Sequence, residues 1–93
     1  MVIIYSKRFN ERLEKILDFI SLDSKERANT FAKKLKSKIK SLTFMPFKCR
    51  KNAVLNDQNV RDLIYKGYVI VFRINQDEIE ILEIFKENLP SLS

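Results

Sequence analysis

The apolar and polar positions alternate most clearly between residues 60 and 85, and this pattern predicts three consecutive β-strands. Residues 60–65 and 68–74 are rich in β-branched and aromatic side chains, and residues 79–85 alternate apolar and acidic side chains with period two. Lys66-Gly67, which holds the single glycine of the chain, separates the first two strands, and residues 75–78 separate the second from the third. The pattern indicates an antiparallel meander with an apolar face that a second layer must cover.

The first half of the chain predicts that covering layer. Residues 2–5 are a short β-branched run, which we interpret as a first strand, and Ser6 is placed to cap a following helix. The apolar residues of segment 7–21 recur at helical spacing and define one face, formed by Phe9, Leu13, Ile16, Leu17 and Ile20.

A second amphipathic helix follows after a break in the pattern at Leu22-Asp23. Either Asp23 or Ser24 caps it, and its apolar face extends to about residue 42 or 43, while its outer face carries five lysines. The short connection predicts an antiparallel helix hairpin. The expected fold is therefore α+β, in the order β-α-α-β-β-β, with the hairpin packed on one face of an antiparallel sheet.

The remaining segments predict irregular structure. Pro46 ends the second helix because it disfavours helical geometry at the preceding residue. Residues 48–59 are polar and indicate a loop, with a short extended piece at 53–55, and residues 86–93 indicate a loosely ordered tail. We expect residues 1–93 to form a single domain, because a chain of this length has room for one core.

Charge is distributed unevenly along the chain. Residues 1–52 carry 14 basic and 5 acidic side chains, and residues 53–93 carry 4 basic and 7 acidic ones, so net charges of +9 and −3 add to +6. Such a basic surface favours an acidic partner or a nucleic acid, whereas the simpler alternative is a solvated helix face. No apolar run reaches membrane-spanning length and no signal-peptide core is present, so we expect a cytoplasmic protein without a membrane partner.

The absence of histidine excludes most familiar catalytic sites. Without imidazole there is no Ser-His-Asp or Cys-His pair, no histidine-ligated metal and not the usual general base near neutral pH. Cys49 is the single cysteine, which leaves no intrachain disulfide and no cysteine metal cluster. We therefore expect no cofactor, no metal and no catalytic residue, and a protein that acts by binding.

The polar residues of the predicted sheet are the remaining candidates for a site. Arg61 and Arg73 lie on neighbouring predicted strands and could form an anion-binding surface; the alternative is a pair of exposed arginines near acidic neighbours. Tyr65 and Lys86 are further candidates for contact with a target. The lysine-rich second helix by itself also permits a small nucleic-acid-binding module, although no aromatic platform is evident beside the lysines.

The ordered set of motifs resembles the ParE/RelE superfamily of bacterial toxins from type II toxin–antitoxin pairs. The resemblance covers nearly the whole chain and rests on FNERLEKILDFI, on ANTFAKKLKSKIKSLTFMP and on NVRDLIYKGYVIVFRINQDEIEILEIF. Within these segments, Leu42 to Pro46, Arg61 to Leu63, Gly67 to Ile74 and Ile79 to Leu82 match the family pattern. The resemblance implies a fold in which a strand is followed by a helix hairpin and then by a three-stranded meander.

Two branches of this superfamily imply different mechanisms. RelE-like members cut messenger RNA on the ribosome with basic side chains on the sheet, but here the corresponding positions are Val60, Asp62 and Val69, and no tyrosine follows Tyr68. The chain is more similar to the ParE-like branch, whose studied members inhibit DNA gyrase by binding it. That resemblance implies Arg61, Arg73, Lys86 and Tyr65 as target-binding candidates, with a RelE-like mRNA endonuclease as the alternative.

The resemblance also implies a protein partner. Toxins of this superfamily are neutralised by a cognate antitoxin, which lays acidic and apolar residues over the toxin. The basic first half of the chain and the apolar residues of the helix hairpin suit such a partner, and the candidates for its contact are Phe9, Leu13, Lys36 and Lys40.

Overall fold

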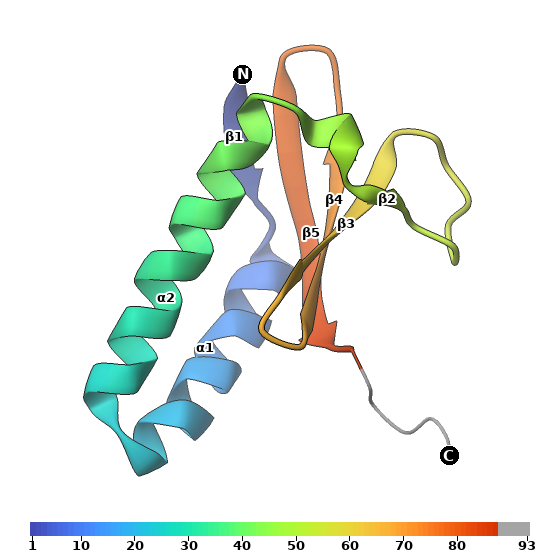
Figure 1. The fold of residues 1–93 in the computed structure, drawn as a ribbon. Helices are drawn as coiled ribbons and strands as arrows, with labels where there is room; N and C mark the ends of the chain where they lie inside the picture. Colours follow the sequence, from blue (N-terminus) through green and yellow to red (C-terminus); the bar gives the residue numbers. More distant parts are fainter. Residues whose placement is uncertain (88–93) are drawn as a thin grey trace.

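The two helices cover one face of a five-stranded sheet (Figure 1). The structure, a computed structural model, describes residues 1–87. Its strands are β1 (Val2–Tyr5), β2 (Arg50–Lys51), β3 (Val60–Tyr65), β4 (Tyr68–Ile74) and β5 (Glu78–Lys86), its helices are α1 (Lys7–Asp23) and α2 (Lys25–Lys40), and two single 3₁₀ turns follow as η1 (Ser41–Thr43) and η2 (Pro46–Lys48). The α+β class and the order of the main elements are confirmed.

Strands β3, β4 and β5 form the expected antiparallel meander. Lys66 and Gly67 have φ angles of 48° and 82°, so a two-residue turn with both central residues in the left-handed region joins β3 to β4. Tyr65 and Tyr68 face each other directly across this turn. Glycine meets the backbone requirement of its position without strain, whereas lysine adopts the same region at some cost.

The N-terminal strand makes the sheet mixed and not purely antiparallel, which corrects the sequence prediction. The strand order is β1-β5-β4-β3-β2, and β1 runs parallel to β5 with Ile3 opposite Ile79 and Tyr5 opposite Ile81. β5 is the last strand of the meander, so one of its edges is left for β1 to pair with. Alternation along a strand indicates which face is buried but carries no information on the direction of its neighbour.

A β-bulge interrupts the alternation of β5. Phe72 pairs with Ile81 while Val71 pairs with Glu83, so Leu82 is an extra residue in β5. The simple period-two prediction for residues 79–85 is therefore wrong beyond Ile81. Because of the bulge, the isoleucines of β5 join the core under the helices, and Leu82 packs on the opposite face of the sheet.

Helix α1 begins as expected and ends later than expected. Ser6 is its N-cap and accepts a hydrogen bond from the Phe9 backbone N–H at 3.0 Å. The helix continues through Leu22 and Asp23, where the sequence pattern predicted a break. Ser24 is extended, ends α1 by donating its N–H to the Ile20 carbonyl, and caps α2 with its side chain, so a single residue separates the helices.

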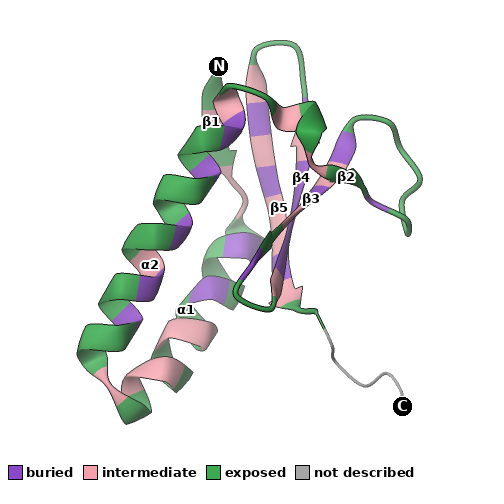
Figure 2. Ribbon diagram, viewed as in Figure 1, coloured by how far each residue is buried: buried purple, intermediate pink, exposed green. Residues whose placement is uncertain are grey.

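Helix α2 ends at Lys40, and the expected helical continuation to residues 42–43 is the 3₁₀ turn η1. The inner faces of both helices and one face of the sheet form the main core, which Figure 2 shows as buried residues on the sides of the helices that face the sheet. Its buried members are Phe9, Leu13, Phe31, Leu35, Ile39, Leu42, Tyr65, Ile70, Phe72, Ile74, Ile79, Ile81 and Ile84.

The opposite face of the sheet carries a smaller apolar cluster, consisting of the buried residues Val60, Val69 and Val71 with the partly buried Leu82 and Phe85.

The loop that precedes β3 differs from the prediction. Its paired residues are Arg50 and Lys51, which form β2 beside β3, whereas residues 53–55 form a turn. The side-chain oxygen of Asn52 accepts a hydrogen bond from the Leu55 N–H at 2.8 Å, and this bond favours the turn.

The end of β5 also corrects the sequence prediction. Lys86 belongs to the strand and pairs with Tyr68, so the expected loose tail does not begin at residue 86. The rest of that predicted tail, residues 88–93, lies outside the described residues. No helix within residues 1–87 is long and apolar enough to cross a membrane.

Candidate functional site

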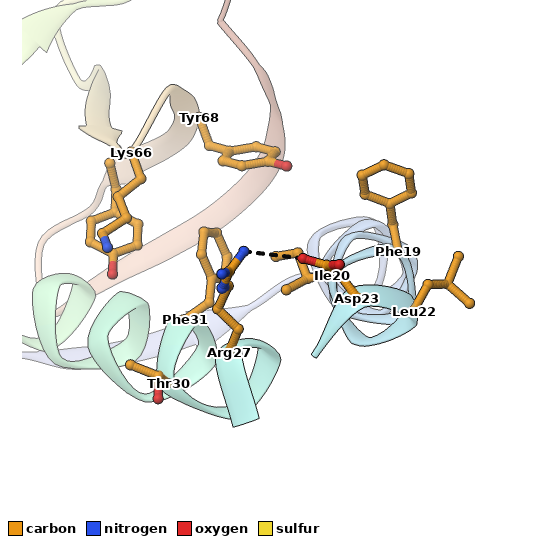
Figure 3. A pocket seen from close by; sticks show the side chains of 10 residues that line it. Phe19, Ile20, Leu22, Asp23, Arg27, Thr30, Phe31, Lys66 and Tyr68 are labelled. Carbon is orange, nitrogen blue, oxygen red and sulfur yellow. Dashed lines mark hydrogen bonds and ion pairs between the residues drawn. The ribbon is translucent and has the colours of Figure 1, made fainter. Parts of the chain in front are cut away.

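An apolar groove opens where the tip of the helix hairpin approaches the β3–β4 turn (Figure 3). It has a volume of about 620 Å³. Its walls come from the end of α1, the start of α2 and the turn, and they consist of Phe19, Ile20, Leu22, Asp23, Arg27, Thr30, Phe31, Tyr65, Lys66 and Tyr68. Figure 3 shows Phe19 and Leu22 on α1 and Tyr68 across from the helices. Arg27 and Asp23 form an ion pair at 3.2 Å and both line the groove.

The exposed apolar side chains of this groove have no role in the core. Phe19 is 72% exposed and Leu22 is 85% exposed. Neither belongs to the apolar face of α1 that was predicted from helical spacing and that packs on the core. Exposed apolar residues are unremarkable singly, but several that border one groove indicate a surface for a partner. In the sequence, the signal for this surface is the pair of large apolar residues outside the predicted apolar face, which were not among the predicted site residues.

A second hollow of about 420 Å³ continues the apolar groove along α1 towards the end of β5. It shares Phe19 and Tyr68 with the groove and has basic residues around it. Its further lining residues are Arg12, Lys15, Ile16, Ile84, Phe85 and Lys86. The Lys86 ammonium lies 5.7 Å from the centre of the Tyr68 ring. The two hollows thus form a path with an apolar floor and a cationic rim.

Arg61 holds the protein's own backbone. Its guanidinium donates hydrogen bonds to the carbonyls of Gln58 at 3.0 Å, Phe47 at 3.3 Å and Cys49 at 3.1 Å. It also lies over the Phe47 ring, 5.0 Å from the ring centre. The side chain therefore fastens the loop between α2 and β3 to the sheet, and most of its donors are committed to this task.

The two arginines of the predicted anion-binding surface lie on opposite faces of the sheet. Arg61 pairs with Phe72, which faces the helices, whereas Arg73 pairs with Val60 and Glu80 on the other face. Directly paired residues of antiparallel strands project to the same side, so a single surface formed by both arginines is ruled out. Of the two possibilities that the sequence left open, the shared anion-binding surface is excluded.

The remaining candidates separate by burial. Tyr65 is 7% exposed and packs in the core, whereas Lys86 is exposed at the rim of the second hollow. Phe9 and Leu13, which were expected to contact an antitoxin, are 0% and 6% exposed. They face the sheet, so the prediction that their side chains meet a partner is wrong. Helical spacing identified the apolar face of α1 correctly, but that face is buried in the core.

The two lysine candidates on α2 remain at the surface. Lys36 and Lys40 are both exposed, and the Lys36 ammonium lies 5.8 Å from the centre of the Tyr5 ring. Burial raises the pKa of the Tyr5 hydroxyl above its ordinary value. Tyr5 is therefore neutral near pH 7 and interacts with the lysine through its ring.

Asp62 and Cys49 show how the charges near Arg61 are arranged. The buried Asp62 carboxylate accepts hydrogen bonds from Asn52 at 2.8 Å and Arg50 at 3.2 Å, which compensates its loss of water. Burial raises the pKa of the Cys49 thiol, and the nearby Arg61 opposes this by favouring the thiolate. Cys49 is therefore a neutral thiol at pH 7.

Within residues 1–87 no group of histidine, cysteine or carboxylate side chains is arranged to hold a metal ion.

A family comparison identifies the class of protein. The family model described as the ParE toxin of a type II toxin–antitoxin system, parDE, matches residues 3–88, which is nearly the whole chain. The chain belongs to the ParE toxin family. It is thus a ParE-family toxin of a ParDE toxin–antitoxin system, and the branch that the motifs indicated is confirmed.

The fold of this ParE-family chain agrees with a solved relative. A chain of the chromosomal ParDE toxin–antitoxin system from P. aeruginosa superimposes with a TM-score of 0.75 at 21% sequence identity, and the match covers 92% of this chain and 95% of the other. At that identity the likeness shows the shared fold alone. A search of curated proteins finds no match.

Proposed function

We propose that this ParE-family toxin acts in the bacterial cytoplasm by binding DNA gyrase, and that a cognate antitoxin neutralises it through the apolar groove. The observation that carries the second part is the groove itself, with exposed Phe19 and Leu22 along an apolar path. Arg12, Lys15 and Lys86 border the path. An amphipathic, acidic segment of an antitoxin would bury its apolar side on the floor and pair its carboxylates with the rim.

The gyrase part of the proposal rests on membership of the family and on the residues of the sheet. A RelE-like nuclease site would occupy the face that carries Val60, Asp62 and Val69. Here both valines are buried in the smaller cluster, and the Asp62 carboxylate is bound to Asn52 and Arg50. This face offers no free cation at those positions to stabilise a transition-state phosphate. The geometry therefore favours inhibition by binding.

The groove is tested by calorimetry with the antitoxin encoded beside the toxin gene. The variant Phe19→Ser with Leu22→Ser removes two apolar side chains from the groove. We expect its affinity for the antitoxin to fall at least about tenfold, because each anchor buried at an interface contributes more than about 1 kcal/mol. Phe44→Ser with Val54→Ser is the matched control, since these side chains are 84% and 89% exposed and lie outside the groove. Equal affinities of the two double variants would contradict the proposed location.

The target is tested with purified toxin in a gyrase supercoiling assay. We expect dose-dependent inhibition, relieved by the antitoxin, and a weaker effect of Lys86→Glu, which reverses the charge at an exposed candidate position. Full supercoiling at saturating toxin would rule out gyrase. Cleavage of messenger RNA at the ribosomal A site in a translating extract would instead establish the endonuclease alternative.

A further inference from the structure

A third hollow lies between α2 and β3; it shares Tyr65 with the apolar groove but is otherwise lined by lysine and serine side chains. Its volume is about 430 Å³. We call it the α2–β3 cleft, and its lining residues are Lys34, Ser37, Lys38, Ser41 and Tyr65. Lys34 and Lys38 lie one helical turn apart on α2, so both ammonium groups border the same opening. Neither lysine forms an ion pair with a carboxylate within residues 1–87.

The buried side of the cleft holds a polar atom without a partner. Tyr65 is 7% exposed, its ring packs 5.4 Å from the ring of Phe31, and within the described part of the chain its hydroxyl oxygen is buried without a hydrogen-bond partner. A buried hydroxyl that makes no hydrogen bond destabilises a protein by about 1–3 kcal/mol. Such an atom beside two unpaired lysines indicates a place where an anionic oxygen could accept a hydrogen bond from the hydroxyl.

The helix that borders the cleft and the loop that follows this helix are rich in basic residues. Residues 27–56 contain nine basic side chains and no acidic one. The Lys38 ammonium lies close enough to the Cys49 thiol to favour its thiolate, as Arg61 does. An anion that enters the cleft therefore meets positive potential from α2 and from the loop that follows it, with no carboxylate of that segment to compete.

We infer that the α2–β3 cleft binds a phosphate group of a nucleic-acid backbone. Lys34 and Lys38 supply the charge, and the hydroxyl of Tyr65 donates a hydrogen bond to a phosphate oxygen. The Ser37 hydroxyl, on the same helix face, is a further donor, whereas Ser41 already donates to the Lys38 carbonyl at 2.6 Å. The cleft is separate from the sheet face that carries Val60 and Val69, since Tyr65 lies on the helix side of the sheet.

Aromatic side chains at the end of α2 favour a nucleic acid over an acidic peptide. Phe44 is 84% exposed and Phe47 is 51% exposed, and both lie in sequence between Lys40 and Lys48. Arg61 lies over the Phe47 ring and holds the η2 turn in place through the Phe47 carbonyl. Exposed aromatic rings in a basic segment can stack with the bases of a nucleic acid, whereas an acidic peptide has no bases to stack.

The inference goes beyond the proposed function, because it concerns the isolated toxin and requires neither gyrase nor antitoxin. It is tested by fluorescence anisotropy with labelled single-stranded and duplex DNA over a series of salt concentrations. For Lys34→Gln with Lys38→Gln, we expect the slope of log affinity against log salt to become shallower by about one, since the cleft neutralises one phosphate and each neutralised phosphate releases about one counterion.

The matched control is Lys7→Gln with Lys25→Gln, which removes the same charge from exposed positions outside the cleft. We expect its slope and affinity to remain close to those of the parent protein. Equal effects of the two double variants, or no DNA binding by the parent protein, would overturn the inference. Circular dichroism verifies that each variant is folded.

Tyr65→Phe tests the buried hydroxyl separately. The substitution keeps the ring and removes the unpartnered oxygen, so we expect unchanged or higher stability together with about three- to tenfold weaker DNA binding. Unchanged DNA binding would show that the hydroxyl is not a ligand and would overturn the assigned site. In competition with labelled DNA, we expect inorganic phosphate to displace little, and polyglutamate to displace less than unlabelled DNA does at equal charge. If the protein bound polyglutamate and not DNA, the ligand would be an acidic peptide and the inference would be overturned.

Discussion

At the scale of single residues, Arg61 has a structural task that its sequence context did not reveal. An arginine in an Arg-x-Leu strand suggested an exposed charge for a target, but its donors bind three backbone carbonyls of the preceding segment. The nearest of these in sequence is three residues away and the farthest is fourteen. Only tertiary structure brings the carbonyls of Phe47 and Cys49 to the guanidinium.

This role leads to a stability prediction for Arg61. Arg61→Ala should lower the free energy of unfolding by about 1–2 kcal/mol, because three partly exposed hydrogen bonds are lost and their carbonyls return to water. Urea denaturation followed by circular dichroism measures the change. Arg73→Ala is the control and should change stability by about 0.5 kcal/mol or less. If the two variants were equally stable, the guanidinium would have no role in fastening the loop.

At the scale of elements, Ser6 connects β1, α1 and the bulge of β5. Its hydroxyl accepts from the Phe9 N–H and donates to the Leu82 carbonyl at 2.9 Å, and its backbone N–H donates to the Ile81 carbonyl at 2.9 Å. The bulge leaves the Leu82 carbonyl available for this contact. Glu83 beside it pairs with Arg8 at 3.4 Å, which adds a weaker link between α1 and β5.

The two helix caps provide a matched pair of substitutions. Ser6→Ala should cost about 2 kcal/mol, because it removes a cap and a second hydrogen bond to the bulge, both partly buried. Ser24→Ala should cost about 1 kcal/mol, because its cap to the Arg27 N–H is exposed. Thermal or chemical denaturation of both variants measures the difference. Equal losses would mean that the bond from Ser6 to β5 contributes nothing to stability.

At the scale of the whole molecule, β1 ties the first residues of the chain to β5, more than seventy positions later. Its side chains alternate between the core and the surface: Ile3 packs against the main core, whereas Ile4 is 42% exposed. The helix hairpin lies between β1 and the meander in sequence, so pairing of β1 with β5 closes the helical layer over the sheet.

Adjacent isoleucines allow this closure to be tested with one chemistry. Ile3→Ala should lower the free energy of unfolding by about 2 kcal/mol, at the low end for a large-to-small change in a core because Ile3 is only partly buried. Ile4→Ala should cost less than about 1 kcal/mol, mainly through a lower strand propensity. Chemical denaturation compares the two. A larger loss at Ile4 would contradict the assigned facing of β1.

The elements were largely predictable from the sequence because each depends on local chemistry. Capping by Ser6, the left-handed turn at Gly67 and the apolar face of α1 follow from residue type and spacing. The candidate site was less predictable. Phe9 and Leu13 were placed on the correct face but assigned to a partner, although the core of the same chain buries them.

The sequence by itself determined the α+β class, the order of the elements, the cationic character of α2 and the absence of imidazole chemistry, because these depend on composition and on periods of two and about 3.6 residues. Tertiary structure alone decided the parallel pairing of β1, the bulge at Leu82, the separation of Arg61 from Arg73 and the grouping of Lys34, Lys38 and Tyr65 in one cleft. These features depend on which distant segments become neighbours. Hydrophobic pattern specifies that a face must be covered, but packing in three dimensions decides what covers it and what stays exposed.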